Sequence, residues 1–133
     1  MRLSVATNFD PALVEAMKEY PVVELFGKLR EDAVGGGRAP YQLARVSRKR
    51  LADHVRQARL AGIDFNYLLN ASCLGNREMT RTGQREIEEL AGWLCEIGVA
   101  SVTVSSPYLL KLIKTRYPKL KVRVSVFGGV DRV

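Results

Sequence analysis

Apolar residues recur at every second position in five short segments of the chain, which is the spacing typical of β-strands. The five segments cover residues 3–8, 22–26, 63–70, 101–105 and 122–127. Between them, apolar residues recur every three or four positions, which predicts helices. The pattern therefore predicts alternating strands and helices, with one long interruption at residues 28–46.

Residues that start and stop helices flank each of the four helical segments. Ser, Thr and Asp side chains cap the first turn of a helix, and proline is suited to the first helical position. Glycine or proline commonly ends the segment. The expected starts are Asp10-Pro11, Ser47, Thr82 and Ser106-Pro107, and the expected stops are Tyr20-Pro21, Gly62, Gly98 and Tyr117-Pro118.

Strands that are joined by crossover helices pair in parallel, with right-handed connections. The repeated βα units therefore predict an α/β fold, either a TIM-type (βα) barrel or an open, doubly wound sheet. A parallel sheet that is covered by helices on both faces normally has strands that are apolar throughout. These strands alternate instead, which favours a barrel with a polar interior.

The alternation divides the strand residues into two sets. The set expected against the helices is Leu3, Val5, Val23, Leu25, Phe65, Tyr67, Leu69, Val102, Val104, Val122, Val124 and Val126. The polar set expected to face the interior is Ser4, Asn8, Glu24, Asn66, Asn70, Thr103, Ser105, Arg123 and Ser125.

The number of strands is too small for a complete barrel, which has eight units and typically 200 or more residues. With 133 residues and five strands, the chain is expected to be a single βα-repeat domain over residues 1–133, the N-terminal part of a larger barrel. Two alternatives remain open. A second copy of the chain completes the barrel as a homodimer, or the fold is an open, flavodoxin-like sheet.

The composition is that of a globular protein, with 47% hydrophobic and 26% charged residues. No apolar run is long enough for a membrane span, and the N-terminus lacks the apolar segment of a signal peptide, so we expect a cytoplasmic protein without a membrane partner. Two cysteines and one histidine match no metal-ligand spacing, and no metal site is expected.

The net charge of +7 raises the question of nucleic-acid binding. Two basic segments, residues 45–50 and 111–123, hold about half of the Lys and Arg residues. Both segments overlap predicted helices or strands, whose solvent-exposed faces are commonly charged. An RNA-binding surface and an ordinary solvated surface both remain open.

Several stretches resemble one known protein family along nearly the whole chain. They read LSVATNFD, YPVVELFGKL, VGGGR, GIDFNYLLNASCLGNRE and EIGVASVTVSSPYLLKLIKTRYPKLKVRVSVF. They are similar to the N-terminal half of the collagenase-like peptidase family, whose peptidases are of unclassified catalytic type. The segment NASCLGNRE is the most distinctive of them.

The resemblance implies a peptidase or a hydroxylase. The family also includes prephenate-dependent hydroxylases of tRNA and ribosomal RNA, and relatives that hydroxylate a ubiquinone precursor. It therefore makes a small anionic ligand, a peptide substrate, or tRNA or rRNA the expected partner. The hydroxylase members hold an iron–sulfur cluster through cysteines in a later part of the chain. No cofactor is therefore expected in this segment, and Cys73 and Cys95 are not assigned as ligands.

The end of the third strand is rich in small polar residues. Parallel βα folds gather ligand-binding groups at the carboxyl ends of their strands. Asn70 is therefore a predicted catalytic residue, and a guanidinium such as that of Arg77 binds carboxylate or phosphate through two parallel donors. A capped loop is the structural alternative. The predicted ligand-binding residues are Asn8, Asn76, Arg77, Ser105 and Arg123.

Glu24 and Arg123 are the charged residues expected inside the barrel. A buried charge must be paired or must bind something, because a lone buried ion costs several kcal/mol. If they face a cavity, Glu24 is the acid–base candidate and Arg123 the anion binder. The alternative is that they pair with each other.

The glycine-rich stretch at residues 34–38 lies in the long interruption. It lacks the Lys-Ser/Thr of a phosphate-binding P-loop and predicts a mobile lid instead. We therefore expect a polar interior that forms a small-molecule or peptide site. The alternatives are an RNA-binding module of an RNA-modifying enzyme and a self-associating structural half-barrel.

Overall fold

The computed structural model describes residues 1–129, and these form a parallel sheet of five strands with helices between them. The strands are β1 (Leu3–Ala6), β2 (Val22–Gly27), β3 (Asp64–Leu69), β4 (Ser101–Val104) and β5 (Lys121–Val124). The helices are α1 (Pro11–Met17), α2 (Arg48–Leu60), α3 (Arg81–Glu96) and α4 (Pro107–Arg116). Three short 3₁₀ helices complete the set: η1 (Pro40–Gln42), η2 (Arg77–Met79) and η3 (Val126–Gly128).

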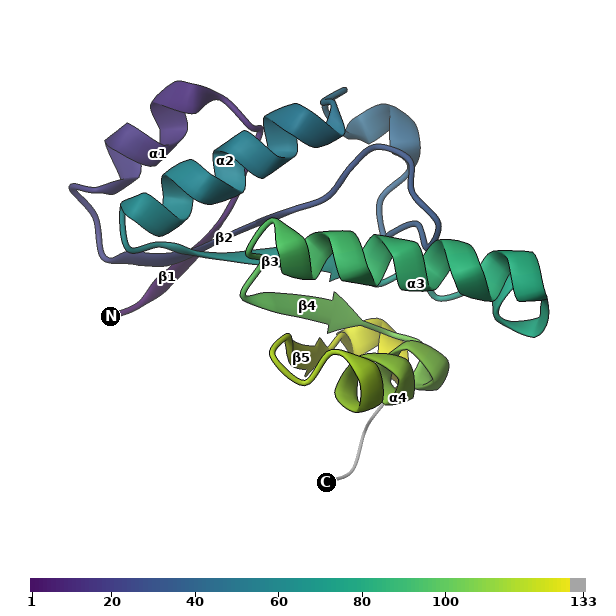
Figure 1. Ribbon diagram of the computed structural model, residues 1–133. Coiled ribbons are helices and arrows are strands. Elements are labelled where there is room, and N and C mark those ends of the chain that lie inside the picture. The colour runs from purple at the N-terminus through teal and green to yellow at the C-terminus, as the bar shows by residue number, and fades with distance from the viewer. Residues whose placement is uncertain (130–133) are drawn as a thin grey trace.

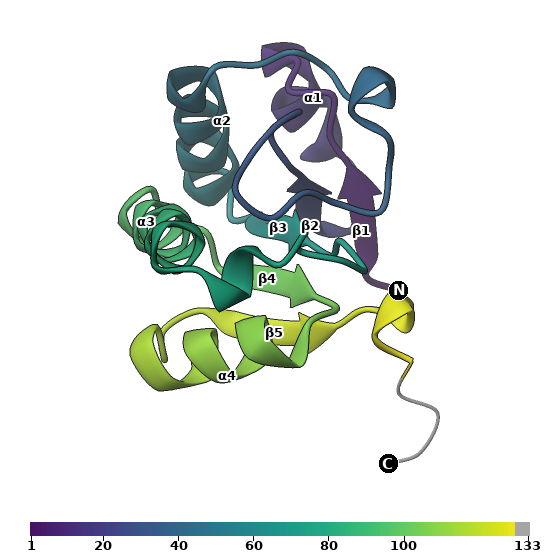
Figure 2. The ribbon, with the colours of Figure 1, turned by 90° about the vertical axis from the view of Figure 1, so that its right-hand side faces the viewer.

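The strands lie side by side in the order in which they occur in the sequence, β1-β2-β3-β4-β5, and every neighbouring pair is parallel. Figures 1 and 2 show the helices following one another along one side of the twisted sheet. The predicted repeat of βα units is confirmed. Its sequential order is that of consecutive units of a (βα) barrel, whereas the flavodoxin-like alternative requires the order 2-1-3-4-5.

The core lies between the sheet and these helices. Burial of apolar side chains on both surfaces drives this packing, at roughly 25 cal/mol per Å² removed from water. Side chains that are fully or almost fully buried there are Leu25, Phe65, Tyr67, Leu69, Val102 and Val104 of the strands, with Leu51, Val55, Ile87, Leu90, Leu94, Leu109 and Ile113 of the helices.

Most of the predicted helix signals are present. Asp10 accepts a hydrogen bond from Ala12 N, and Ser47 accepts one from Arg50 N. The expected cap of α3 at Thr82 is wrong, because Thr80 caps this helix by accepting from Gly83 N. The helix therefore begins one residue before Thr82.

The strand ends differ from the prediction at β1 and β5. β1 ends at Ala6, so Asn8 lies in the following loop. β5 ends at Val124, because Ser125 Oγ accepts a hydrogen bond from Phe127 N and turns the chain into η3. Val126 is consequently 90% exposed instead of lying on the helix-facing side.

A β-bulge changes which valine of β2 is buried. Leu3 is opposite Val22, but the next residue, Ser4, is opposite Glu24, so Val23 is the extra residue of β2. Val22 is 8% exposed and belongs to the core, whereas Val23 is 39% exposed. The expectation that Val23 faces the helices is therefore wrong, because simple alternation does not hold across a bulge.

The bulge predicts unequal effects of two matched substitutions. Val22→Ala removes two buried methyl groups and is expected to lower the free energy of unfolding by about 1.5 kcal/mol. Val23→Ala removes half-exposed methyl groups and is expected to cost about 0.5 kcal/mol or less. Urea denaturation of both variants measures the difference, and equal losses would contradict the bulged register.

Candidate functional site

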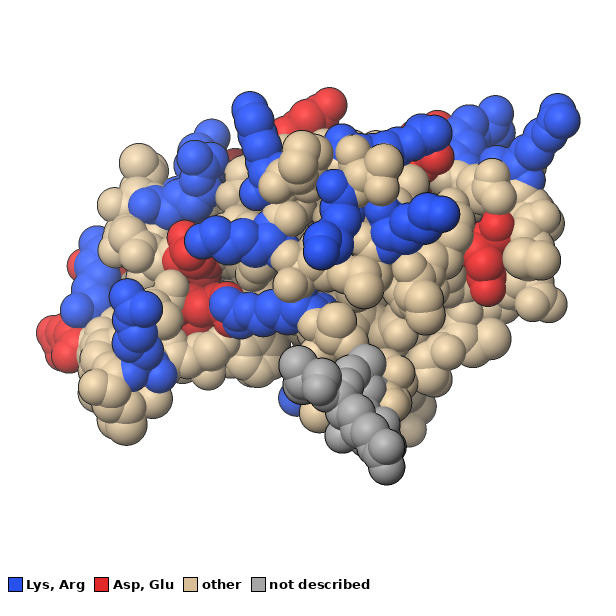
Figure 3. All heavy atoms as spheres, turned by 90° about the horizontal axis from the view of Figure 1, so that it is seen from below, with Lys and Arg blue, Asp and Glu red and all other residues tan. Residues whose placement is uncertain are grey.

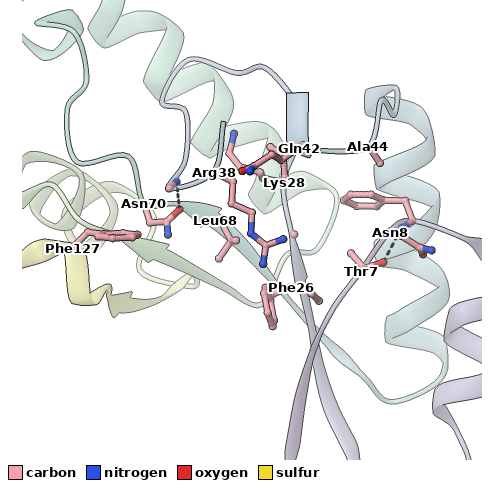
Figure 4. Close-up of a pocket in the computed structure, with 15 residues that line it drawn as sticks. Thr7, Asn8, Phe26, Lys28, Arg38, Gln42, Ala44, Leu68, Asn70 and Phe127 are labelled. Atoms are coloured by element: carbon pink, nitrogen blue, oxygen red, sulfur yellow. Dashed lines mark hydrogen bonds between the residues drawn. The ribbon is translucent and has the colours of Figure 1, made fainter. Parts of the chain in front are cut away.

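A pocket of about 670 Å³ opens at the carboxyl ends of β1, β2 and β3. Its walls combine aromatic rings, three amide side chains and two basic side chains, and no acidic residue of the described chain lines it. Figure 4 shows how these side chains surround the space. The main lining residues are Asn8, Phe9, Phe26, Lys28, Arg38, Gln42, Leu68, Asn70 and Phe127.

Asp32 anchors the loop that forms one wall of this pocket. Its side chain is fully buried, and its Oδ2 accepts from Lys28 Nζ at 2.6 Å and from the Tyr67 hydroxyl at 2.6 Å. Its Oδ1 accepts from the backbone N–H groups of Val34 and Gly35, at 2.9 and 2.7 Å. Four donors therefore satisfy one buried carboxylate.

Tyr67 links this anchor to the core of the sheet. Its ring is completely buried under the helices, and its hydroxyl accepts from Leu29 N while it donates to Asp32. Burial, together with the neighbouring Asp32 carboxylate, raises the pKa of Tyr67, so the phenol remains a donor. The loop is thus attached to a rigid strand.

The anchored loop brings its glycines and Arg38 over the end of β3. Gly37 N donates to Asn70 Oδ1 at 3.2 Å. A Cβ atom at Gly37 would lie 2.6 Å from the Phe127 ring, so any other residue here would displace that ring. Arg38 makes no hydrogen bond or ion pair within residues 1–129, and its side chain extends into the pocket between Asn70 and Asn8 (Figure 4).

The loop after β1 forms the opposite wall. Phe9 has φ 63°, a left-handed conformation that is unfavourable for a bulky side chain, by roughly 1–2 kcal/mol. Its ring is nonetheless 3% exposed and lines the pocket. Asn8 accepts from Asp10 N through Oδ1. Backbone strain of this kind persists only where surrounding contacts enforce it.

The structure brings together some of the predicted site residues. Asn8 and Asn70 both line the pocket, and Ser105 lies behind Asn70, where its Oγ donates to the Asn70 carbonyl at 3.1 Å. Asn76 and Arg77 lie outside this pocket. Asn76 adopts a left-handed turn, and Arg77 pairs with Glu86 on α3 at 3.2 Å, as the capped-loop alternative predicts.

Glu24 and Arg123 form an ion pair on the sheet face that the helices do not cover. The two guanidinium nitrogens of Arg123 lie 2.6 Å from the two carboxylate oxygens of Glu24. Ser4 and Ser101 also donate to Glu24, at 2.7 and 3.5 Å. The pair joins β2 to β5, and neither residue lines the pocket, so the pairing alternative describes the observed geometry.

Arg38 and Lys28 were not among the predicted site residues. Lys28 immediately follows β2, at a strand end where ligand groups gather, and this position was the available signal. Arg38 gave no comparable signal, because its place depends on the path of a loop without periodicity. Since Asp32 neutralises Lys28, Arg38 supplies the uncompensated positive charge of the pocket.

The chemistry of the pocket follows from these groups. A guanidinium and three amides offer directed hydrogen bonds to an oxyanion, while Phe9, Phe26 and Phe127 offer apolar surface. Within the described residues, no group of three or more His, Cys, Asp or Glu side chains is arranged to hold a metal ion. None of the helices in residues 1–129 has the length and hydrophobicity needed to cross a membrane.

Comparison with known proteins identifies relatives. No protein-family model matches the chain. An uncharacterized protease, MJ1657 of Methanocaldococcus jannaschii, is 38% identical over 98 residues, which are 74% of this chain and 28% of that protein. The structure of the U32 peptidase Mk0906 superposes with a TM-score of 0.73 at 20% identity, covering 98% of this chain and 51% of the other. These findings support the resemblance to the collagenase-like, U32 peptidase family over part of the length of both proteins.

The matched part of the chain spans 28% of the length of MJ1657 and 51% of that of Mk0906. The similarity to Mk0906 confirms the α/β fold of repeated βα units, and the similarity to MJ1657 extends over most of the sequence. The peptidase resemblance that the sequence predicted is therefore confirmed.

The iron–sulfur cluster of hydroxylase members does not fit the cysteines of this chain. Such a cluster needs four thiolate ligands or a close equivalent. The chain has two cysteines, of which Cys73 is exposed in the loop after β3 and Cys95 is half-buried on α3. These two thiols alone therefore do not hold such a cluster.

Removing one partner of the ion pair across the sheet is expected to lower the free energy of unfolding. Arg123→Met leaves the Glu24 carboxylate, in a residue 4% exposed, without its main partner, and is expected to cost on the order of 2 kcal/mol of unfolding free energy. Lys121→Met on the same strand removes an exposed charge and is the matched control, expected to cost less than about 0.5 kcal/mol.

The double variant Glu24→Gln with Arg123→Met is expected to lose less than the sum of its single changes, because neither charge is then left alone. Chemical denaturation measures the unmodified chain, Arg123→Met, Lys121→Met, Glu24→Gln and the double variant. If Arg123→Met is as mild as Lys121→Met, the pair is not stabilising, and Arg123 regains its predicted role as a ligand-binding residue.

Proposed function

We propose that this chain supplies a ligand-binding part of a U32 family active site, and that the pocket at the strand ends binds an anion carrying an apolar group. The anion is a small carboxylic acid or the carboxylate of a peptide. Arg38 carries the proposal, because it is a cation directed into a pocket that no acidic residue of the described chain lines.

Three further features support this assignment. The amides of Asn8 and Asn70 lie in the same pocket as Arg38 and provide directional donors. The Lys28 charge is already neutralised by Asp32, so Arg38 has no competing acidic partner there. The rings of Phe26 and Phe127 offer surface for an apolar group, and Phe127 is 57% exposed without a ligand.

The pocket also agrees with the location of ligand sites in parallel βα folds. Such sites are built from the loops after the strands, which vary without disturbing the sheet. Glu24 lies on the sheet face that the helices do not cover, where it is paired with Arg123. Of the two predicted catalytic residues, Asn70 is the one that lines the pocket. An acid–base role for Glu24 would require a ligand that displaces Arg123.

The first test uses two probes of the same shape, 3-phenylpropanoate and its uncharged amide. The acid is expected to bind in titration calorimetry, and the amide to bind at least about tenfold more weakly, because it lacks the charge that Arg38 pairs with. Arg38→Gln is expected to remove this preference while the melting temperature stays the same, since Arg38 is exposed and unpaired within residues 1–129.

Arg81→Gln, an exposed arginine at the start of α3 outside the pocket, is the matched control and is expected to bind the acid normally. The dipeptide N-acetyl-alanyl-phenylalanine distinguishes a peptide carboxylate from a small acid by its affinity relative to 3-phenylpropanoate. Equal binding of acid and amide by the unmodified chain would refute an anion site.

A second candidate function is RNA binding through α4 and β5. Residues 107–124 contain six basic and no acidic residues. Arg116 and Arg123 pair with Glu88 and Glu24, whereas the four exposed lysines have no ion pair within the described chain. The face that includes α4 carries many Lys and Arg side chains (Figure 3). The four lysines are Lys111, Lys114, Lys119 and Lys121.

RNA binding through these lysines predicts a steep dependence on salt. Each phosphate contact contributes roughly −0.7 to −0.9 to the slope of log K against log salt. Replacing Lys111, Lys114 and Lys119 by Gln is therefore expected to make the slope shallower by about 2, measured by fluorescence anisotropy with a single-stranded RNA. Arg38→Gln is the control and leaves the slope unchanged. An unaltered slope in the triple variant would exclude this surface.

A further inference from the structure

The strained turn at Phe9 is held in place by helix α2, on the other side of the sheet from the uncovered face. The two hydrogen-bonding groups of its backbone are both engaged. Phe9 N donates to Thr7 Oγ1 at 2.9 Å, and the Phe9 carbonyl accepts from Arg50 Nε and Nη2 at 3.3 and 3.2 Å. Arg50 belongs to the first turn of α2.

His54, one turn further along α2, supports the same turn through Thr7. Its Nε2 lies 2.7 Å from Thr7 Oγ1, and its ring meets the Phe9 ring edge-on at a centroid distance of 5.3 Å. Gly27 on β2 leaves room for this arrangement, because a Cβ there would lie 2.9 Å from Thr7 Cγ2 and 3.1 Å from the Phe9 ring. Helix α2 and strand β2 therefore enclose the turn.

The histidine is not placed for stability alone. The residue is 2% exposed, and its Nδ1 is buried without a hydrogen-bond partner within the described chain. An unpaired buried polar atom is costly, and an apolar side chain would fill the same site more favourably. A side chain retained at such a cost, beside a strained residue at a pocket, points to a role at that pocket.

The hydroxyl–imidazole distance is also that of a nucleophile and its base. A catalytic role does not follow, because no carboxylate of residues 1–129 orients Nδ1 and the Thr7 oxygen is already engaged by His54 and by Phe9 N. What the contacts do provide is a fixed turn that places Asn8 and Phe9 at the pocket wall.

We propose that His54 and Arg50 are positioning residues for the pocket: they hold the Thr7–Phe9 turn in its strained conformation, and protonation of His54 releases it and weakens ligand binding. This inference rests on the proposed anion site for its effect on affinity. The effect on the turn itself is independent of any ligand.

The charged groups around the imidazole set the direction of the pH effect. Arg50 on α2 and Asp10 at the start of α1 face the ring, and its other neighbours are Thr7, Phe9 and Phe65. Burial first, and then the Arg50 charge, lower the pKa of His54 below its ordinary value, while Asp10 opposes them. An imidazolium carries an N–H donor on each ring nitrogen, and the donor on Nδ1 would be buried without a partner within the described chain.

This lowered pKa determines how the stability of the folded chain changes with pH. An unfolded chain takes up the proton near pH 6.5, before the folded protein does. The stability that comes from the neutral ring is therefore complete above about pH 6.5 and is lost as the pH falls from there toward the folded-state pKa. The turn is expected to be fixed at neutral pH and released in acid.

The experiment measures the affinity for 2-phenylethanesulfonate, an aromatic anion that stays ionised, from about pH 8 to pH 5. The unmodified chain is expected to lose about tenfold in affinity in acid. His54→Leu is expected to bind about tenfold more weakly at pH 8. His54→Gln, whose amide reaches the position of Nε2 and does not titrate, is expected to recover most of this loss and to show no acid transition.

A second readout keeps the inference separate from the proposed site. The amide signals of Asn8 and Phe9 in ¹H–¹⁵N spectra are expected to shift together with pH in the unmodified chain and to stay constant in His54→Gln. The chain has one histidine, so the transition is unambiguous.

The outcomes distinguish the two proposals. If the unmodified chain does not bind the sulfonate at pH 8, the anion site fails, and the amide signals alone decide the role of His54. If it binds with the same pH dependence in His54→Gln, the anion site stands and the inference is overturned. Amide signals at Asn8 and Phe9 that do not respond to pH would overturn it as well.

Discussion

The buried carboxylate of Asp32 is the interaction on which the pocket depends. One side chain neutralises Lys28, accepts from the Tyr67 hydroxyl and binds two backbone N–H groups of the glycine-rich loop. A buried carboxylate is tolerated only when its charge and its lone pairs are satisfied, so these four contacts form together or not at all. Because Tyr67 belongs to the most buried part of β3, the loop inherits the rigidity of the sheet. Arg38 and the close contact of Gly37 with Asn70 follow from that attachment.

The two faces of the sheet differ in polarity. Helices cover the apolar face, where most of the stabilising burial occurs. The other face keeps polar side chains that bind one another, with Glu24 and Arg123 joining strands that are not neighbours and Asn66 exchanging hydrogen bonds with Thr103. A polar face of this kind cannot pack against an apolar layer without leaving groups unpaired. It suits the polar interior that the alternation within the strands predicted.

The pocket joins the carboxyl ends of three strands to segments that are far apart in the sequence. Its walls come from the turn after β1, the loop after β2, the end of β3 and the short helix η3. Two of these segments are held by buried polar contacts rather than by regular secondary structure: the loop after β2 by Asp32, and the turn after β1 by Arg50 and His54. Both sets of contacts connect these segments to the core. They hold irregular backbone in a defined place although the sheet is small.

The sequence by itself determined the elements, their parallel pairing and the gathering of polar residues such as Asn70 at the carboxyl ends of the strands, because these depend on local periodicity, on capping residues such as Asp10 and Ser47, and on the rule that parallel strands end at one edge. The tertiary structure alone decided the bulge at Val23, the path of the loop that delivers Arg38, the pairing of Glu24 with Arg123, and the strained backbone of Phe9. Each of these rests on contacts between residues distant in the sequence, and irregular backbone carries no period from which its course can be read.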